Sequence, residues 1–261
     1  MGVIFGHHVL VLLFVMAYHN RMERERFQRI LDHWHELVEM KSPFRFLFVD
    51  SLGEKLQTGF PHDVLEYKDS PVLKRFQRTA REWAFVAQYV EENMDCTCWF
   101  WWEWDVLPVQ KDCFEFFRQR WTNSCRVMGY HVKDNKWGMR HRINGVAFYA
   151  RDYWSYFAPS FDAARTFDTC KRFDPKTDRN CFVELNRWYC LVQHEISSSF
   201  PFALTPGLRL VHGIKDESLL EHMLGERKHF AVRSDTWRAL RYRFKLLLTQ
   251  LRLRKVQPPE R

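Results

Sequence analysis

The sequence has no apolar run long enough to cross a membrane. Its best candidate, residues 9–18, is uninterrupted but short, whereas a spanning helix needs about 20 residues. No basic segment precedes this run, and His7 and His8 stand directly before it. Because a signal peptide begins with basic residues, this pattern does not indicate one. We interpret the run as a buried first strand.

Three further features narrow the class of protein. The seven cysteines are an odd number scattered along the chain, which argues against a disulfide scaffold and fits a reducing compartment, so we expect a cytoplasmic location. Cys96 and Cys98 have no second Cys or His pair at zinc-site spacing, so a zinc site is not expected. No glycine-rich, basic phosphate loop follows the first strand, which disfavours nucleotidyl transfer.

The composition is that of a folded chain with a large core. Of the 261 residues, 46% are hydrophobic and 16% are aromatic, so disorder is not expected. Because no internal repeat or linker is visible, we expect one domain over residues 1–226 and a separate basic tail over residues 227–261. The tail carries eleven Lys and Arg against Asp235 and Glu260, a net charge of +9, although the whole chain has only +8.

The first half alternates between strand and helix patterns. Asn20 and Glu23 form a variant of the capping box at the start of a helix, and Ser70-Pro71 has the composition of another helix start. The expected order is strand 9–17, a helix from 20 onward, strand 44–50, a helix from 70 onward, strand 98–108 and helix 112–120. Such alternation predicts an α/β fold: one Rossmann-like domain whose central, mostly parallel sheet is flanked by helices.

The second half is less regular. Residues 127–130 and 146–150 have the composition of short strands, and residues 157–176 that of a loop-rich lobe. Apolar residues at helical spacing predict a helix over residues 178–193. "LRLVHG" at residues 208–213 predicts a last strand.

The stretch "CWFWWEWDVLP" at residues 98–108 carries two carboxylates near the end of a buried strand. Glu103 and Asp105 are two residues apart, so on an extended chain both point to the same side. Two such charges repel unless a cation lies between them, and a divalent ion is the natural partner. The alternative is that they cap a turn or pair with arginines.

Three ordered segments carry a resemblance to a known family. They are "WWEWDVLPVQKDCFEFF", then "RVMGYH" with "HRINGVAFYARDYW", and then "LVHGIKD". Together, over residues 9–223, they resemble the nucleotide-sugar glycosyltransferases of the A-type fold. In that family an acidic motif ends a central strand, an Asn-Gly pair precedes a short strand, and a distal His and Lys reach the metal and the diphosphate.

The resemblance implies a site. Asp105 and His212 would hold the metal, with Glu103 binding directly or through water, and the mixed oxygen and imidazole donors favour Mn²⁺, with Mg²⁺ as the alternative. The resemblance also assigns cofactor-binding roles at the diphosphate, base or ribose, and sugar to Lys215, Asp50, Asn144 and Gly145. Each has a structural alternative: a core histidine at 212, a surface turn at 215, a turn-forming Asp50 and an Asn144-Gly145 hairpin turn.

The expected function is transfer of a hexose or pentose from a nucleotide-diphosphate sugar to a glycan or lipid-linked acceptor. An inverting enzyme needs a carboxylate that accepts the proton of the acceptor hydroxyl. Asp178, at an expected helix start, and Glu184, inside that helix, are the catalytic candidates. Asp178 as a helix cap and Glu184 as an exposed helix residue are the alternatives, and a retaining enzyme needs no such base.

The basic tail predicts an amphipathic helix that begins at Ser234. Its apolar stripe includes Trp237, Phe244 and Leu251, and arginines and lysines occupy much of the remainder. This pattern suits peripheral binding to an anionic membrane, and the alternative is a helix docked on the domain. Nucleic acid is disfavoured, because the aromatic residues lie in the stripe rather than among the charges. A non-enzymatic adaptor, bound to a membrane or to nucleic acid through this tail, is the competing function.

Overall fold

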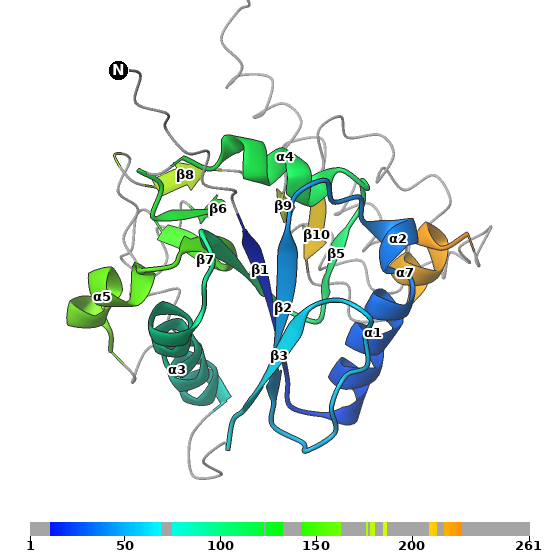
Figure 1. Ribbon diagram of the computed structural model, residues 1–261, viewed down its shortest axis with the longest axis horizontal. Helices are drawn as coiled ribbons and strands as arrows, with labels where there is room; N and C mark the ends of the chain where they lie inside the picture. The colour runs from blue at the N-terminus through cyan, green and yellow to red at the C-terminus, as the bar shows by residue number, and fades with distance from the viewer. Residues whose placement is uncertain are drawn as a thin grey trace, which may run out of the picture.

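The computed structural model is a layered α/β structure (Figure 1). It describes residues 11–68, 75–122, 124–132, 142–162, 176, 178–180, 185–186, 209–212 and 217–225. The strands are β1 Leu12–Tyr18, β2 Phe44–Asp50, β3 His62–Glu66, β4 Cys98–Trp102, β5 Val106–Pro108, β6 Val127–Val132, β7 Arg142–Ala150, β8 Asp178–Asn180, β9 Leu185–Asn186 and β10 Leu210–His212. The helices are α1 Arg21–Asp32, α2 Trp34–Leu37, α3 Arg75–Asn93, α4 Cys113–Arg120, α5 Tyr153–Phe157, the 3₁₀ helix Ala158–Ser160 and α7 Ser218–Met223.

Seven strands form the central sheet in the order β3-β2-β1-β4-β7-β6-β8. All neighbouring pairs are parallel except β4–β7 and β7–β6, so the predicted mostly parallel sheet is confirmed. A second, three-stranded sheet has the order β5-β10-β9. β3 was not predicted from the sequence, and its residues are half-buried or exposed at the edge of the sheet.

The central strand β1 is buried on both faces, as its continuous apolar sequence predicts. Phe14, Met16 and Tyr18 pack on the side covered by α1, α2, α4 and α7. Leu13 and Val15 pack on the opposite side, under α3 and α5. Helices therefore flank both faces of the sheet (Figure 1).

The capping signal at the start of α1 is confirmed. The Asn20 side chain accepts a hydrogen bond of 3.0 Å from the Glu23 backbone N–H. Glu23 Oε2 in turn accepts one of 2.8 Å from the backbone N–H of His19, one residue before the cap. These bonds fix the chain as it leaves β1, so they also fix what residues 19–23 present at that end of the sheet.

The strand predicted over residues 98–108 is wrong in its continuity. It breaks into β4 and β5, and a turn in which Val106 N–H donates to the Glu103 carbonyl (3.0 Å) separates them. β5 leaves the central sheet and pairs antiparallel with β10. Glu103 and Asp105 therefore lie on a turn between two sheets, not on one extended strand.

The helix predicted over residues 178–193 is also wrong where the structure describes it, because β8 and β9 are strands. The helix 112–120 is confirmed as α4, and the strands near 127 and 146 are confirmed as β6 and β7. The helix start at Ser70-Pro71 and the tail from residue 227 lie outside the described residues. Among the helices of the described ranges, none is long and apolar enough to span a bilayer.

Candidate active site

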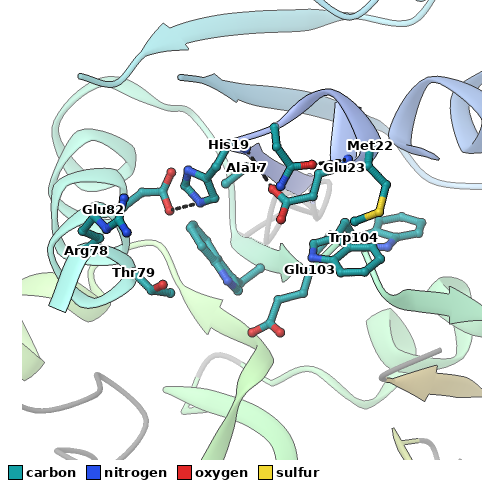
Figure 2. A pocket seen from close by; sticks show the side chains of 12 residues that line it. Ala17, His19, Met22, Glu23, Arg78, Thr79, Glu82, Glu103 and Trp104 are labelled. Atoms are coloured by element: carbon teal, nitrogen blue, oxygen red, sulfur yellow. Dashed lines mark hydrogen bonds and ion pairs between the residues drawn. The ribbon is translucent and has the colours of Figure 1, made fainter. Parts of the chain in front are cut away.

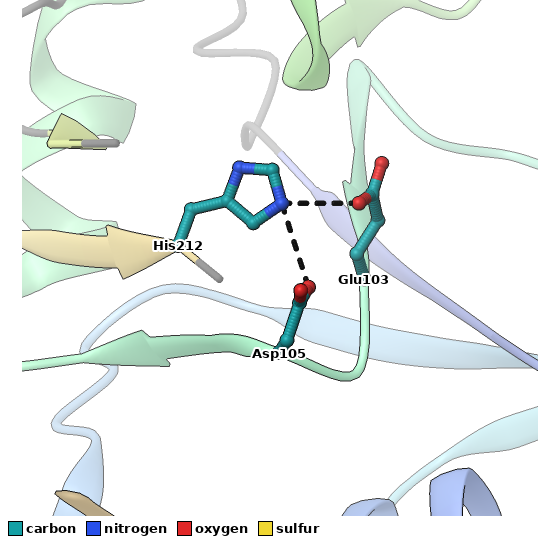
Figure 3. Close-up of side chains that lie close together, drawn as sticks. All are labelled: Glu103, Asp105 and His212. Atoms are coloured by element: carbon teal, nitrogen blue, oxygen red, sulfur yellow. Dashed lines mark hydrogen bonds and ion pairs between the residues drawn. The ribbon is translucent and has the colours of Figure 1, made fainter. Parts of the chain in front are cut away.

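Two carboxylates and one imidazole converge where the two sheets meet (Figure 3). Glu103 follows β4, Asp105 precedes β5, and His212 ends β10 opposite Val106 in the antiparallel pairing. His212 Nε2 lies 3.1 Å from Glu103 Oε2 and 3.4 Å from Asp105 Oδ1. The β5–β10 pairing thus brings His212 to the two carboxylates, although it follows them by more than a hundred residues.

The cluster is largely withdrawn from water. Asp105 and His212 are 4% and 7% exposed, and Glu103 is half-buried. Burial by itself lowers the pKa of His212, but hydrogen bonds to Asp105 and Glu103, together with their negative charge, outweigh it and raise that pKa to about 9. A cation is therefore favoured at this point of the structure, and in the metal-free protein the imidazolium supplies part of that charge.

The donor set fits a divalent transition metal. One ligand atom from each of the three residues can be chosen so that all lie within 4.8 Å of one another. Metal–oxygen and metal–nitrogen bonds of about 2.0–2.2 Å bring the ligands of one ion to within about 4.4 Å, so only a small contraction is needed. Since Glu103 is half-buried and borders open space, the site also leaves room for a further ligand.

A cleft of about 610 Å³ opens beside the cluster at the carboxyl ends of β1 and β4 (Figure 2). Glu103 belongs to both the cluster and the cleft wall. The remaining lining comes from the start of α1, from α3 and from the tryptophan-rich segment: Ala17, His19, Asn20, Met22, Glu23, Arg78, Thr79, Glu82, Trp101, Trp102 and Trp104. In open α/β sheets this edge is where ligands bind.

A second histidine–carboxylate pair lines the same cleft. His19 Nε2 lies 3.0 Å from Glu82 Oε2, with the Glu82 side chain almost completely buried and the His19 side chain 38% exposed. Ser51 Oγ approaches the other ring nitrogen of His19 at 3.4 Å. This pair was not predicted from the sequence. The position of His19 directly after the first strand was the one available signal, since nothing nearby in sequence points to Glu82.

Other predicted site residues occupy different surroundings. Asp50 forms a turn, as its alternative interpretation predicted: its Oδ1 accepts bonds of 2.8 and 2.9 Å from the N–H groups of Leu52 and Gly53. Asn144 and Gly145 are within β7, where the pairing with β6 shifts register, so a hairpin turn at this pair is wrong.

Asp178 lies in β8, so the helix start expected there is wrong. Its register partners run across the sheet from Val127 to Tyr149 and then to Trp99, at the start of β4. Asp178 is therefore three strand spacings away from β4, and Glu103 lies four residues beyond Trp99 along the chain. Together these steps separate Asp178 from Glu103 by roughly 20 Å. The structure therefore does not bring Asp178 to the cluster of Glu103, Asp105 and His212, and Glu184 and Lys215 lie outside the described residues.

Comparison with known proteins identifies the fold. No protein-family model and no curated protein matches the sequence. The galactosyltransferase LgtC, solved in complex with donor and acceptor sugar analogues, is similar in structure with a TM-score of 0.50; at 10% identity, the match covers 88% of this chain and 99% of that one.

Two other solved structures resemble the chain more distantly. A glycosyltransferase involved in glycosylation of the major capsid of PBCV-1 has a TM-score of 0.46 at 11% identity, covering 83% of this chain and 99% of that one. A197 from STIV has a TM-score of 0.35 at 12% identity, covering 66% and 82%. The likeness to LgtC shows that this chain has the A-type nucleotide-sugar glycosyltransferase fold, as the motif resemblance predicted.

Proposed function

We propose that this protein is a metal-dependent glycosyltransferase that uses a nucleotide-diphosphate sugar as donor. One observation carries the proposal: Glu103, Asp105 and His212, from three separate chain positions, converge beside the cleft of an A-type glycosyltransferase fold. An isolated acidic pair is common on protein surfaces. A buried acid and a buried imidazole at this edge of this fold are much more specific.

The three residues suit a leaving diphosphate. A divalent metal bound by them would supply Lewis-acid stabilisation to the negative charge that develops on the leaving group. Buried Asp105 and His212 would hold the ion, and half-buried Glu103 would bind it directly or through water at the margin of the cleft. Carboxylate and imidazole donors favour Mn²⁺, with Mg²⁺ as the alternative.

The cleft provides a place for the rest of the donor. It extends from Glu103 toward His19 and Glu82 (Figure 2), so a donor whose phosphates lie at the cluster would direct its nucleoside toward this pair. Lys215, three residues after His212 in sequence, is proposed to contact the diphosphate as a point charge. Asn144 and Gly145 remain candidates near the transferred hexose or pentose, and Asp50 near the base or ribose.

For an inverting reaction we propose Glu184 as the base that accepts the proton of the acceptor hydroxyl. Asp178, the other candidate, is disfavoured because the strand register places it roughly 20 Å from Glu103. The acceptor is proposed to be a glycan or a lipid-linked sugar.

A donor screen tests the function. Hydrolysis of UDP-, GDP- and dTDP-sugars is measured with and without Mn²⁺, alongside the thermal shift produced by each nucleotide with the metal. We expect at least one donor to be hydrolysed only when Mn²⁺ or Mg²⁺ is present. If no donor turns over and no nucleotide shifts the unfolding temperature, the competing function, a non-enzymatic adaptor, is favoured.

The basic tail is proposed to hold the cytoplasmic enzyme at an anionic membrane, where a lipid-linked acceptor would lie. Residues 227–261 carry a net charge of +9, and each cation near such a surface contributes about 1 kcal/mol. We expect the full-length protein, but not a version ending before Ser234, to sediment with anionic liposomes and to be released by salt. Equal sedimentation of both versions would show that the tail is not the membrane contact.

A further inference from the structure

One buried cation connects the two chain segments that carry the metal ligands. Arg26, in α1, is 2% exposed. Its Nη1 lies 3.4 Å from Glu217 Oε1, and its guanidinium carbon lies 5.7 Å from the centre of the Trp104 ring. A guanidinium at that distance over an indole attracts the ring, and it does so more strongly when water is excluded.

Glu217 and Trp104, which Arg26 contacts, are close in sequence to all three metal ligands. Trp104 stands between Glu103 and Asp105 on the turn that joins β4 to β5. Glu217 follows His212 by five residues and directly precedes α7, where its carbonyl accepts a 2.8 Å hydrogen bond from the Glu221 N–H. Arg26 therefore contacts both the turn that bears the carboxylates and Glu217, the residue directly before α7.

The burial of Arg26 affects the conformation of the residues around it. A buried guanidinium is costly unless its partners are well placed, so Arg26 favours the chain conformations that keep Glu217 and Trp104 against it. Residues 103–105 lie outside any strand, so a contact on Trp104, together with the backbone hydrogen bond from Val106 to Glu103, helps to fix the direction in which the two carboxylates point. Held in this way, the carboxylates face His212 before a metal arrives.

We propose that Arg26 is a positioning residue for the metal site: by holding Trp104 and Glu217, it preorganises Glu103, Asp105 and His212 for a divalent cation. This inference rests on the proposed function, because it concerns the same site. Outer residues that orient metal ligands typically change metal affinity by about 10- to 100-fold when they are replaced. Arg26 is expected to act in that range without touching the ion.

The test compares two arginines of the same helix. Arg29 Nη1 lies 3.0 Å from Glu217 Oε2 and is 28% exposed, and it is three residues, about 4.5 Å, further along α1. Arg26→Met and Arg29→Met therefore each remove an ion pair with Glu217, but only the first removes the cation over Trp104. Mn²⁺ affinity without nucleotide is measured from the free Mn²⁺ signal in electron paramagnetic resonance, with circular dichroism to confirm folding.

We expect Arg26→Met to weaken Mn²⁺ binding by about tenfold or more, and Arg29→Met to change it by less than about twofold. Arg26→Lys, which keeps the charge but not the planar stacking group, should lie between wild type and Arg26→Met. Trp104→Leu should also weaken binding, and its effect should be much smaller in an Arg26 variant, because the two changes remove the same contact. If Arg26→Met does not fold, Arg26→Lys and Trp104→Leu, alone and combined, give the same comparison.

The outcomes separate this inference from the proposed function. Normal Mn²⁺ affinity in folded Arg26→Met, equal losses in the two arginine variants, or additive effects of the Arg26 and Trp104 changes would overturn the role of Arg26 and leave the metal site intact. A folded wild-type protein that binds neither Mn²⁺ nor Mg²⁺ would overturn both.

Discussion

Two histidine–carboxylate groups border the same cleft and differ in charge balance and burial. His212 is 7% exposed and lies between Glu103 and Asp105, whereas the His19 side chain is 38% exposed and pairs with Glu82. The first group has two carboxylates around one imidazole, and the second pairs one carboxylate with one imidazole. The first is therefore suited to a metal cation, and the second to a polar contact with a ligand.

Burial strengthens this distinction. Charges that are buried away from water interact more strongly, so the two carboxylates around His212 attract a cation more strongly than they would at the surface. Glu82 is 0% exposed and Asp105 is 4% exposed, but Glu82 pairs with the His19 ring, whose side chain is 38% exposed and lines the cleft. Each group should therefore respond to a different ligand, and substitutions should separate the two responses.

The largest effect is expected at Asp105. Asp105→Asn keeps the shape of the side chain but removes one of the two carboxylates, so Mn²⁺ affinity should fall by at least about 100-fold, beyond the range for residues that only orient ligands. Calorimetric titration of Mn²⁺ into the folded variant measures this. Glu82→Gln is the matched control and should bind Mn²⁺ as wild type does; an equal loss in both variants would show that the two groups form one site.

The strands, the capped helix and the grouping of Glu103, Asp105 and His212 could be predicted because their signals are local or carried by a motif. A continuous apolar run marks β1, and Asn20 with Glu23 marks the start of α1. The motif resemblance, not the pattern alone, linked His212 to the acidic turn. The contact between His19 and Glu82 joins α3 to the end of β1, and the two residues are more than sixty positions apart in the sequence. No local sequence pattern therefore predicts it.

Two elements were mispredicted because tertiary pairing overrode local preference. Residues 98–108 have the composition of one strand, but β5 leaves the central sheet to pair with β10. Apolar spacing predicted a helix at Asp178, yet β8 extends the sheet beside β6. In both places the deciding partner lies far away in sequence.

The next largest effect is expected from the proton that His212 binds, which makes both stability and Mn²⁺ affinity depend on pH. Its folded-state pKa of about 9 exceeds the ordinary value of 6.5, so in the metal-free protein its ion pairs stabilise fully below about pH 6.5, and this contribution is lost as the pH rises through about 9. Mn²⁺ must displace the same proton, so its affinity should rise by about tenfold per pH unit across that range.

Chemical denaturation of the chelator-treated protein between pH 6 and 10 measures the stability change, and Mn²⁺ titrations over the same range measure the affinity change. In His212→Asn, the free energy of unfolding should lose the part of its pH dependence that comes from this proton. A wild-type Mn²⁺ affinity that does not vary between pH 6.5 and 9 would contradict the assignment of His212 as a ligand.

A smaller effect is expected when Glu82 is changed and the nucleotide is the ligand. Glu82→Gln removes the negative charge of the ion pair with His19, so nucleotide affinity at saturating Mn²⁺ should fall by about tenfold, which corresponds to about 1.4 kcal/mol. The nucleotide identified in the donor screen is titrated by calorimetry. Unchanged nucleotide affinity would place the nucleoside elsewhere.

The smallest effect is expected at Ser51, and it decides whether His19 is held from one side or from two. Ser51 Oγ lies 3.4 Å from His19 Nδ1, and Ser51 is half-buried, so this is a long contact that water can replace. Ser51→Ala should change nucleotide affinity by less than about twofold and the free energy of unfolding by less than about 0.5 kcal/mol. Both are measured beside Glu82→Gln, by calorimetry and by denaturation. A loss as large as that of Glu82→Gln would mean that His19, like His212, is fixed by two partners, and the contrast between the two groups would then rest on charge alone.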